Sequence, residues 1–443
     1  MRNIFVVLFL SILSSVAVLS QSGGFNSPFS SFGIGDIVDP NPMYLRHMGG
    51  VNAAYADNYH INHVNPASLP YLRATSFDIG ISANNINLKD GQGNTTRDWS
   101  GNLEYLTLAF PLQNPLNEVF EREQKDLRFG MGFSLLPVSR VEYHILNDDS
   151  EELIGDFSRE FLGSGGVYKF QWSNGVLYKG VSFGVNLGYQ FGKISYDRVI
   201  DFAEITAFDN RFTNDYSLKG FTYNVGAMYQ YVLNKEEVVK NPLISAKALN
   251  FGIYGNSKTS FRSESSFVNQ NQFSGSAAGI VTDTLSSGSG ITGDGTLPGQ
   301  LGVGVNYFVG ASFSLGINYV LTSWSDYQND ANPEELSNSN KLSIGGFYRP
   351  NIKSFNYRDR IYYRFGAVIG RGARSIEQNQ LKNYSVNLGL GLPFVYQRKI
   401  SHINLGVEAG RRSAGNVLSE TFVKLGIGLT FNDDEWFIKR KYN

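Results

Sequence analysis

The stretch VSFGVNLGYQF, residues 181–191, alternates strictly between apolar and small or polar residues. Every odd position from Val181 to Phe191 is apolar or aromatic, and Ser182, Asn186, Gln190 and two glycines lie between them. A period of two residues indicates a β-strand with one apolar face. The stretches SFSLGINYVLTSW (312–324), YSVNLGLGLPF (384–394) and INLGVEAG (403–410) repeat the pattern, so it extends over most of the chain.

Alternation alone does not separate a soluble β-sandwich from a membrane barrel. Most of these segments reach the nine to eleven residues that a tilted strand needs to cross a bilayer. Their second face is polar, and the 443 residues include 48 Gly, 25 Tyr and 32 Phe but only 17% charged residues. Glycine and aromatic residues in alternating segments are typical of membrane-spanning barrels. The net charge of −1 gives no indication of a nucleic-acid partner.

Fourteen such segments can be counted, an even number, as single-chain bacterial barrels require. They start near Thr75, Asn102, Leu127, Gly163, Gly180, Ser217, Leu249, Gly299, Ala311, Asn338, Arg360, Lys382, Ile403 and Ser419. The sequence therefore predicts an all-β protein, a 14-stranded antiparallel transmembrane β-barrel.

The connections between the segments differ in length. Tight turns near Lys179 and Val309 follow even-numbered strands, which places them on the periplasmic side, and the long connection Arg262–Pro298 follows an odd one. The Ser, Gly and Thr content of this connection predicts a flexible extracellular loop. Asp283 and Asp294 are possible calcium ligands there, but a solvated loop is the favoured interpretation.

The two ends of the chain indicate export. Residues 1–20 have a basic start, an apolar stretch and small residues before Gln21, the pattern of a signal peptide. The absence of cysteine excludes a lipid anchor at that site, disulfides and thiolate chemistry. Gly426, Gly428 and Phe431 match the terminal-strand signal of barrels that enter the outer membrane of Gram-negative bacteria. Residues 432–443 then form a periplasmic tail.

A barrel of fourteen strands with glycines on its inner face would enclose an empty lumen. The segment VNAAYADNYHINHVNPASLPYL, residues 51–72, is apolar enough to be buried but has no strand period. Irregular backbone at membrane depth is tolerated where protein covers it. We therefore predict that residues 21–72 form an N-terminal plug, or hatch, inside a barrel of residues 73–431.

Three motifs in order give the chain a family resemblance. The first is GGVNAAYAD followed by NPASL, with Ala53, Ala54, Ala56, Asp57, Asn65, Pro66 and Ala67. The second has Pro298 before a hairpin that closes on Trp324 and Ser325, and the third is the strand YRFGAVIGRGA before NYSVNLGLGLPF. Together they resemble the FadL family of outer-membrane transporters for long-chain fatty acids and other hydrophobic compounds, over nearly the whole mature chain.

The resemblance implies a function. Asn65, Pro66, Ala67 and Asp57 would be the hatch motif, and hydrophobic small molecules would pass by hatch displacement and lateral exit into the bilayer. Outer-membrane lipid and a hydrophobic ligand would be the partners. Some FadL relatives, such as the PorV-type barrels of type IX secretion, serve larger envelope machines. The alternative is therefore a non-transporting accessory subunit of an outer-membrane secretion or assembly complex, with other outer-membrane or periplasmic proteins as partners.

Other chemistry has little support in the sequence. The tail residues Trp436, Phe437, Lys439, Arg440 and Lys441 suggest either interfacial contacts with lipid or a docking peptide. His60 and His63 are interpreted as hydrogen-bonded plug residues rather than metal ligands. His144 and His402 lack a convincing catalytic partner. We expect no metal, no cofactor and no enzymatic activity.

Overall fold

The computed structural model describes residues 27–31, 33–113, 126–151, 155–202, 208–241, 244–273, 281–331, 333–396 and 399–433. The predicted signal peptide and the tail residues from Trp436 to Lys441 lie outside this part of the chain. Within the described residues, none of the helices has the length and apolar character needed to cross a membrane.

The wall is a closed antiparallel β-barrel of fourteen strands, as predicted. In order, the wall contains β2 (Thr75–Asp90), β3 (Thr95–Pro111), β4 (Leu127–Glu151), β5 (Gly155–Tyr178), β6 (Val181–Phe202), β7 (Asp209–Val232), β8 (Lys247–Asn256) with β9 (Thr259–Phe273), β10 (Val281–Leu297) with β11 (Gln300–Val309), β12 (Phe313–Thr322), β14 (Ser339–Tyr348), β15 (Tyr362–Ile376), β16 (Asn379–Tyr396), β17 (Lys399–Ala414) and β18 (Leu418–Asp433). The ladder between β18 and β2, from Leu418↔Asp90 to Asp433↔Thr75, closes the barrel.

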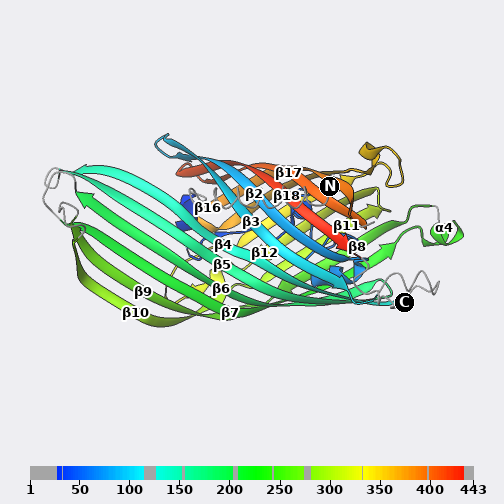
Figure 1. The fold of residues 1–443 in the computed structure, drawn as a ribbon, viewed down its shortest axis with the longest axis horizontal. Coiled ribbons are helices and arrows are strands. Elements are labelled where there is room, and N and C mark those ends of the chain that lie inside the picture. Colours follow the sequence, from blue (N-terminus) through cyan, green and yellow to red (C-terminus); the bar gives the residue numbers. More distant parts are fainter. Residues whose placement is uncertain are drawn as a thin grey trace, which may run out of the picture.

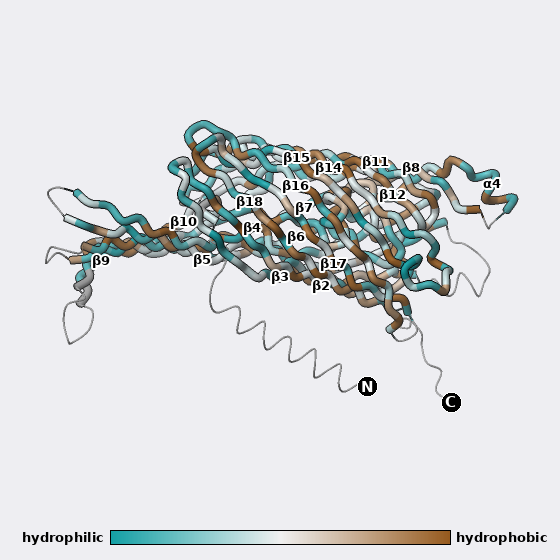
Figure 2. The backbone as a smooth tube through the Cα atoms, turned by 90° about the horizontal axis from the view of Figure 1, so that it is seen from above, coloured by the Kyte–Doolittle hydropathy of each residue, from teal (hydrophilic) through white to brown (hydrophobic). Residues whose placement is uncertain are grey.

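The alternating sequence gives the wall two different faces. In β6, Phe183 and Leu187 are exposed on the outside, whereas Ser182 and Asn186 are buried in the lumen. Figure 2 shows brown and teal residues alternating along the wall strands, as a period of two requires. The apolar exterior is the face that a bilayer covers.

The strands have unequal heights. β4 to β7 run 22 to 25 residues, and with β9 and β10 they project far beyond the shorter strands on the other side (Figure 1). The prediction of a flexible loop over Arg262–Pro298 was wrong, because β9 and β10 form a hairpin there. The physical reason is that β7 extends past β8, and its edge pairs with β9 from Asp209↔Gln272 to Lys219↔Arg262.

The opposite end of the barrel carries the turns at residues 179–180 and 310–312 and the short helix α4 (Lys235–Lys240), and we call it the turn end (Figure 1). The N-terminal plug lies in the lumen. It contains η1 (Pro28–Ser31), β1 (Asp36–Ile37), α2 (Met43–Arg46) and η2 (Pro66–Tyr71). The remaining short elements are β13 (Gln328–Asn329), which pairs with β10, and the 3₁₀ turns η3 (Trp324–Asp326) and η4 (Tyr357–Arg360).

Candidate functional site

The plug base, which we define as Asn52–Leu72, is organised by asparagine side chains. The Asn65 amide donates to the Ala53 carbonyl at 2.6 Å, and its oxygen accepts from the Ala67 amide at 3.1 Å, which caps η2. Pro66 follows at the first position of the turn, where a missing N–H costs nothing. Asn65, Pro66 and Ala67 are all buried inside the barrel. The local sequence therefore folds the chain into a compact body without strand pairing.

Inward-facing amides of the wall bind the backbone of the plug base. Gln171 donates to the His63 carbonyl at 2.9 Å, and Asn224 donates to the Val64 carbonyl at 2.8 Å. Asn318 accepts from the Ala53 amide at 3.0 Å. These bonds satisfy buried backbone groups that the plug cannot pair internally.

The glycines of the inner wall allow the plug base to approach the wall backbone directly. A Cβ atom added to Gly175 would lie 2.5 Å from the Pro66 carbonyl oxygen, and one added to Gly130 would lie 2.5 Å from the Leu69 oxygen. Real Cβ atoms do not come this close. The small inner face predicted from sequence is therefore occupied by plug backbone rather than by an open channel.

Asp57 and the two nearby histidines stabilise one turn of the plug. The Asp57 carboxylate accepts from the Tyr59 amide at 2.7 Å and from the Tyr55 hydroxyl at 3.1 Å, and it lies 3.3 Å from His60 Nδ1. His63 Nε2 lies 2.6 Å from the Pro40 carbonyl. The structure thus buries both histidines in the plug, where His63 is hydrogen-bonded but neither ring nitrogen of His60 has a partner with hydrogen-bond geometry in the described part of the chain. The described residues contain no group of three or more His, Cys, Asp or Glu side chains arranged for a metal ion.

The wall has a seam between β3 and β4. Among the described residues these strands pair over only six positions, from Leu106↔Leu135 to Pro111↔Gly130. Beyond the pair Leu106↔Leu135, toward the far end of β4, the two strands are no longer paired. β4 has a register shift between Pro137 and Ser139. Proline has no N–H to give to a ladder, so it suits an edge or a bulge. The sequence of β4 therefore ends its pairing with β3 and leaves a strand edge inside the wall.

The plug closes this edge with residues 33–39, which we call the latch segment. β1 pairs with β4 through Asp36↔Arg140 and Ile37↔Ser139, and the Val38 amide donates to the Val138 carbonyl at 3.0 Å. Gly35 has φ +95° and lies against the Arg140 backbone, where a side chain would overlap it. The latch segment thus takes the place that β3 would occupy.

Charged side chains hold the latch segment to the far wall. Asp36 lies 2.7 Å from Arg412 Nη1 and 3.4 Å from Arg374 Nη1, and Asp39 lies 2.8 Å from Lys341 Nζ. Burial alone would raise the pKa of the Asp36 carboxyl, but Arg412 and Arg374 outweigh burial and lower it. Burial likewise raises and Lys341 lowers the pKa of Asp39, with a net decrease. Both carboxylates therefore remain ionised in the closed plug.

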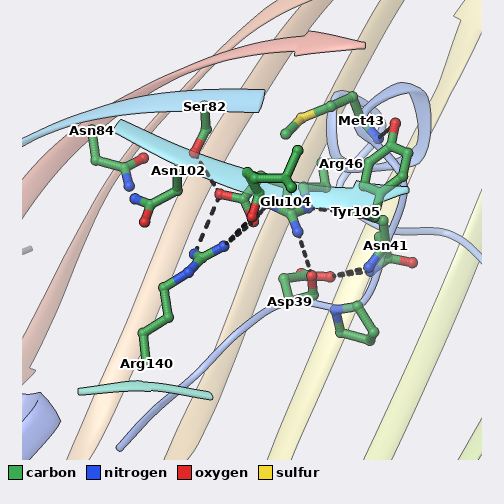
Figure 3. Close-up of polar contacts among 12 residues, drawn as sticks. Asp39, Asn41, Met43, Arg46, Ser82, Asn84, Asn102, Glu104, Tyr105 and Arg140 are labelled. Atoms are coloured by element: carbon green, nitrogen blue, oxygen red, sulfur yellow. Dashed lines mark hydrogen bonds and ion pairs between the residues drawn. The ribbon is translucent and has the colours of Figure 1, made fainter. Parts of the chain in front are cut away.

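A second charged cluster bridges the seam itself (Figure 3). Glu104 of β3 is 3.0 Å from Arg46 Nη1 of the plug and 3.2 Å from Arg140 Nη2 of β4. Ser82 also donates to Glu104 at 2.5 Å, and Arg140 donates to the Leu103 carbonyl at 2.8 Å. Plug, β3 and β4 thus meet at one buried carboxylate.

A cavity of about 340 Å³ lies between the latch segment, the seam and the wall. Seven basic and four acidic side chains line it, so positive charge predominates. Apolar groups line it as well, including Ile34, Trp324, Leu336, Leu381 and Phe422. Its lining can accommodate both a polar anionic group and a hydrophobic group.

The sequence and the structure select different residues for this site. Sequence reasoning singled out Asn65, Pro66, Ala67 and Asp57, which the structure brings together in the plug base. It missed the charged residues of the latch segment and the seam. Their only signal was the presence of charges, such as Glu104, within an alternating strand. The tail residues proposed for docking lie outside the described part of the chain.

Several solved structures share this fold at low sequence identity. A Pseudomonas aeruginosa FadL homologue has 12% identity and a TM-score of 0.58, and the match covers 90% of this chain and 99% of that one. A mutant of the monoaromatic hydrocarbon channel TodX has 16% identity and a TM-score of 0.56, with coverage of 88% and 98%. The Pseudomonas putida toluene transporter TodX has 15% identity and a TM-score of 0.53, with the same coverage. The expected FadL-like fold is confirmed, and this fold is typical of Gram-negative outer membranes.

Sequence comparisons add a family assignment. No curated protein matches the chain. The family model described as BamG matches residues 1–443, which is the full length of the sequence. The chain therefore belongs to the BamG family.

Proposed function

We propose that this protein lies in the outer membrane of a Gram-negative bacterium and passes amphiphilic small molecules, such as long-chain fatty acids, by displacement of the latch segment and lateral exit through the β3–β4 seam. The observation that carries the proposal is the position of the cavity directly beside an incompletely paired wall. The structural relatives named as hydrocarbon channels support a hydrophobic solute.

The cavity chemistry supports a solute with two parts. A buried anionic head requires a cationic partner, and the cavity offers Arg374 and Arg412. In the closed state both pair with Asp36, and Arg412 also pairs with Glu420. An apolar tail gains nothing by entering the aqueous periplasm. Exit through the seam delivers the tail directly to the bilayer, whereas passage along the axis would require removal of the whole plug base.

A disulfide that locks the latch segment tests this proposal. Ile37 and Ser139 are opposite residues of the β1–β4 ladder, so Ile37→Cys with Ser139→Cys has the spacing that a disulfide needs. The native chain contains no cysteine, so the two introduced residues can pair only with each other. We expect the oxidised variant to lose uptake of labelled oleate in a deletion strain and to recover it on reduction.

A matched control is Lys382→Cys with Ser413→Cys, which joins two wall strands away from the seam. Uptake should be unaffected by its oxidation. Normal uptake with the latch disulfide fully formed would show that the latch segment does not move during transport, and the proposal would be wrong.

A second candidate is an accessory subunit of an outer-membrane secretion or assembly complex. The observation that favours it is the tall sheet of β4–β7, β9 and β10. Among the described residues, the ladder of β10 outside its pairing with β9 is limited to Gly295 and Thr296. Val281–Gly293 therefore presents an open strand edge, a surface to which an extended segment of another protein can add. Membership of the BamG family also supports this candidate.

The two candidates predict different results when the hairpin is removed. Replacing Ser263–Gly293 by a two-residue Asn-Gly turn removes most of β9 and β10 and keeps the wall ladders of β8 and β11. If this sheet docks a partner, co-purification from detergent-solubilised outer membrane should fail while the barrel still assembles. Unchanged co-purification, or no partner with the full-length chain, would rule out docking at this sheet.

A further inference from the structure

The connection between β14 and β15, residues 349–361, holds an aromatic side chain entirely in the open; we call it the Phe355 loop. Phe355 has a relative exposure of 104%, the highest among the exposed large hydrophobic side chains that the structure describes. Tyr357 is exposed at 44%. Phe355 and Tyr357 thus give this loop two exposed aromatic side chains, which can contact another apolar surface.

The loop is ordered by its own hydrogen bonds. The Asn351 amide donates to the Asp359 carbonyl at 2.9 Å, and the Ser354 hydroxyl donates to the Asp359 carboxylate at 2.7 Å. The Asn356 oxygen accepts from the Arg358 amide at 3.3 Å and caps η4. Phe355 is therefore presented by a preorganised turn, which lowers the entropic cost of binding.

The base of the loop is fixed to the barrel rim. The Arg349 side chain donates to the Ala311 carbonyl at 2.9 Å, and its guanidinium lies 4.1 Å from the centre of the Tyr362 ring. Tyr348 and Tyr363, a cross-strand pair at the ends of β14 and β15, are exposed on the outer face. Tyrosines at this position are typical of a membrane interface. The loop thus begins at the level where the lipid-facing wall ends.

The charges of the loop complement a phosphate surface. Lys353, Arg358 and Arg360 are basic, and the single acidic residue Asp359 is engaged by Ser354. Arg360 also lies over the Tyr357 ring at 5.5 Å. The golden loop at the turn end projects sideways beyond the outline of the wall, whereas α4 projects along the barrel axis (Figure 1).

We propose that the Phe355 loop docks on the phospholipid surface at the turn end of the barrel. Phe355 enters the boundary between headgroups and acyl chains, and Lys353, Arg358 and Arg360 bind lipid phosphates. An aromatic residue flanked by cations matches the two layers of such a surface, an apolar interior below an anionic plane. This anchor is independent of transport and of the latch segment.

The test uses a spin label on the native, full-length barrel in vesicles of phosphatidylcholine with phosphatidylglycerol. The chain has no cysteine, so Phe355→Cys gives a single labelling site. The matched control is Val239→Cys on α4, which is also apolar and 73% exposed but has Lys235, Glu236, Glu237 and Lys240 around it.

We expect the label at position 355 to be more accessible to oxygen than to a water-soluble nickel complex, and the label at position 239 to show the reverse. Replacing Lys353, Arg358 and Arg360 by Gln should reduce the difference at position 355. Equal nickel accessibility at the two positions would overturn the proposal. If the label inserts into lipid but its depth does not change when all three basic residues are replaced, the proposed binding of phosphates is wrong.

Discussion

The plug base and the latch segment belong to the same plug but are held in opposite ways. The base contacts wall glycines through its backbone and is bound by inward-facing amides such as Asn224 and Gln171. The latch segment is held by ion pairs of Asp36 and Asp39 and by a short ladder with β4. Close packing cannot adjust by small steps, whereas an ion pair can be exchanged for another anion. The plug base is therefore suited to stay in place, and the latch segment is suited to move.

The largest effect should come from filling the space between the base and the wall. Gly175→Val places a side chain 2.5 Å from the Pro66 oxygen and 2.8 Å from Pro70 Cδ. We expect a loss of about 3 kcal/mol, because overpacking against backbone cannot be relieved by a rotamer change. The loss of stability can be measured by urea unfolding and by the heat-dependent change of electrophoretic mobility. Gly101→Val is the control, since nothing lies within 4 Å of that position; equal stability of the two variants would contradict close packing of the base.

Removal of the Asn65 side chain should rank second. Asn65→Ala leaves the Ala53 carbonyl and the Ala67 amide without their bonds at 2.6 and 3.1 Å. Two unpaired buried groups of this kind, at the lower end of the usual cost of about 1–3 kcal/mol each, should together cost about 2 kcal/mol. Urea unfolding should show this loss of stability. Asn94→Ala in an exposed turn serves as control. If Asn65→Ala left the stability unchanged, the Asn65 side chain would not hold the plug base.

Asp36→Asn should affect the opening of the barrel more than its assembly. The substitution removes the charge that pairs with Arg374 and Arg412. We expect higher conductance in planar bilayers and a smaller loss of urea stability than for Asn65→Ala, because Arg412 keeps Glu420 as a partner and the base stays in place. The exposed turn residue Asp90, changed to Asn, is the control. Unchanged conductance with Asp36→Asn would mean that the ion pairs do not hold the latch segment.

The smallest effect should be the dependence on pH. The pKa values of Asp36 and Asp39 are lowered in the closed plug, so their stabilisation is present above the ordinary carboxyl pKa of about 4 and is lost as the pH falls further. Conductance should therefore be constant near neutral pH and rise in acid. The rise should be weaker in Asp36→Asn, and a rise on going to alkaline pH would contradict the sign of this linkage.

The wall could be predicted from sequence because the alternation within each strand identifies its apolar and its polar face. VSFGVNLGYQF specifies which residues meet lipid without reference to any other strand, and the strand count follows. The β9–β10 hairpin could not be predicted in this way, because its Ser, Thr and Gly residues become strands through pairing with the extended edge of β7. Neighbouring strands, and not local preference, determine that region.

The candidate site was predictable only in part for a similar reason. The plug base has local signals, with Asn65 capping the turn that Pro66 begins. The charges of the latch segment and the seam lie far apart in sequence: Asp36 and Arg412 are separated by 376 positions. A single sequence gives no sign of such a pairing, because each charge by itself is indistinguishable from a solvated one.

The closing ladder between β2 and β18 has a consequence for the biogenesis of the barrel. Ser76 and Asn432, which contact each other across it, are 356 positions apart, so the ring cannot form until nearly the whole chain has been made. The plug precedes β2 and occupies the lumen, apart from the cavity beside the latch segment. It must therefore be enclosed while the sheet is still open, and the entropic cost of joining such distant strands makes this step slow. The folding pathway, and not only the finished structure, thus determines how the plug comes to occupy the lumen.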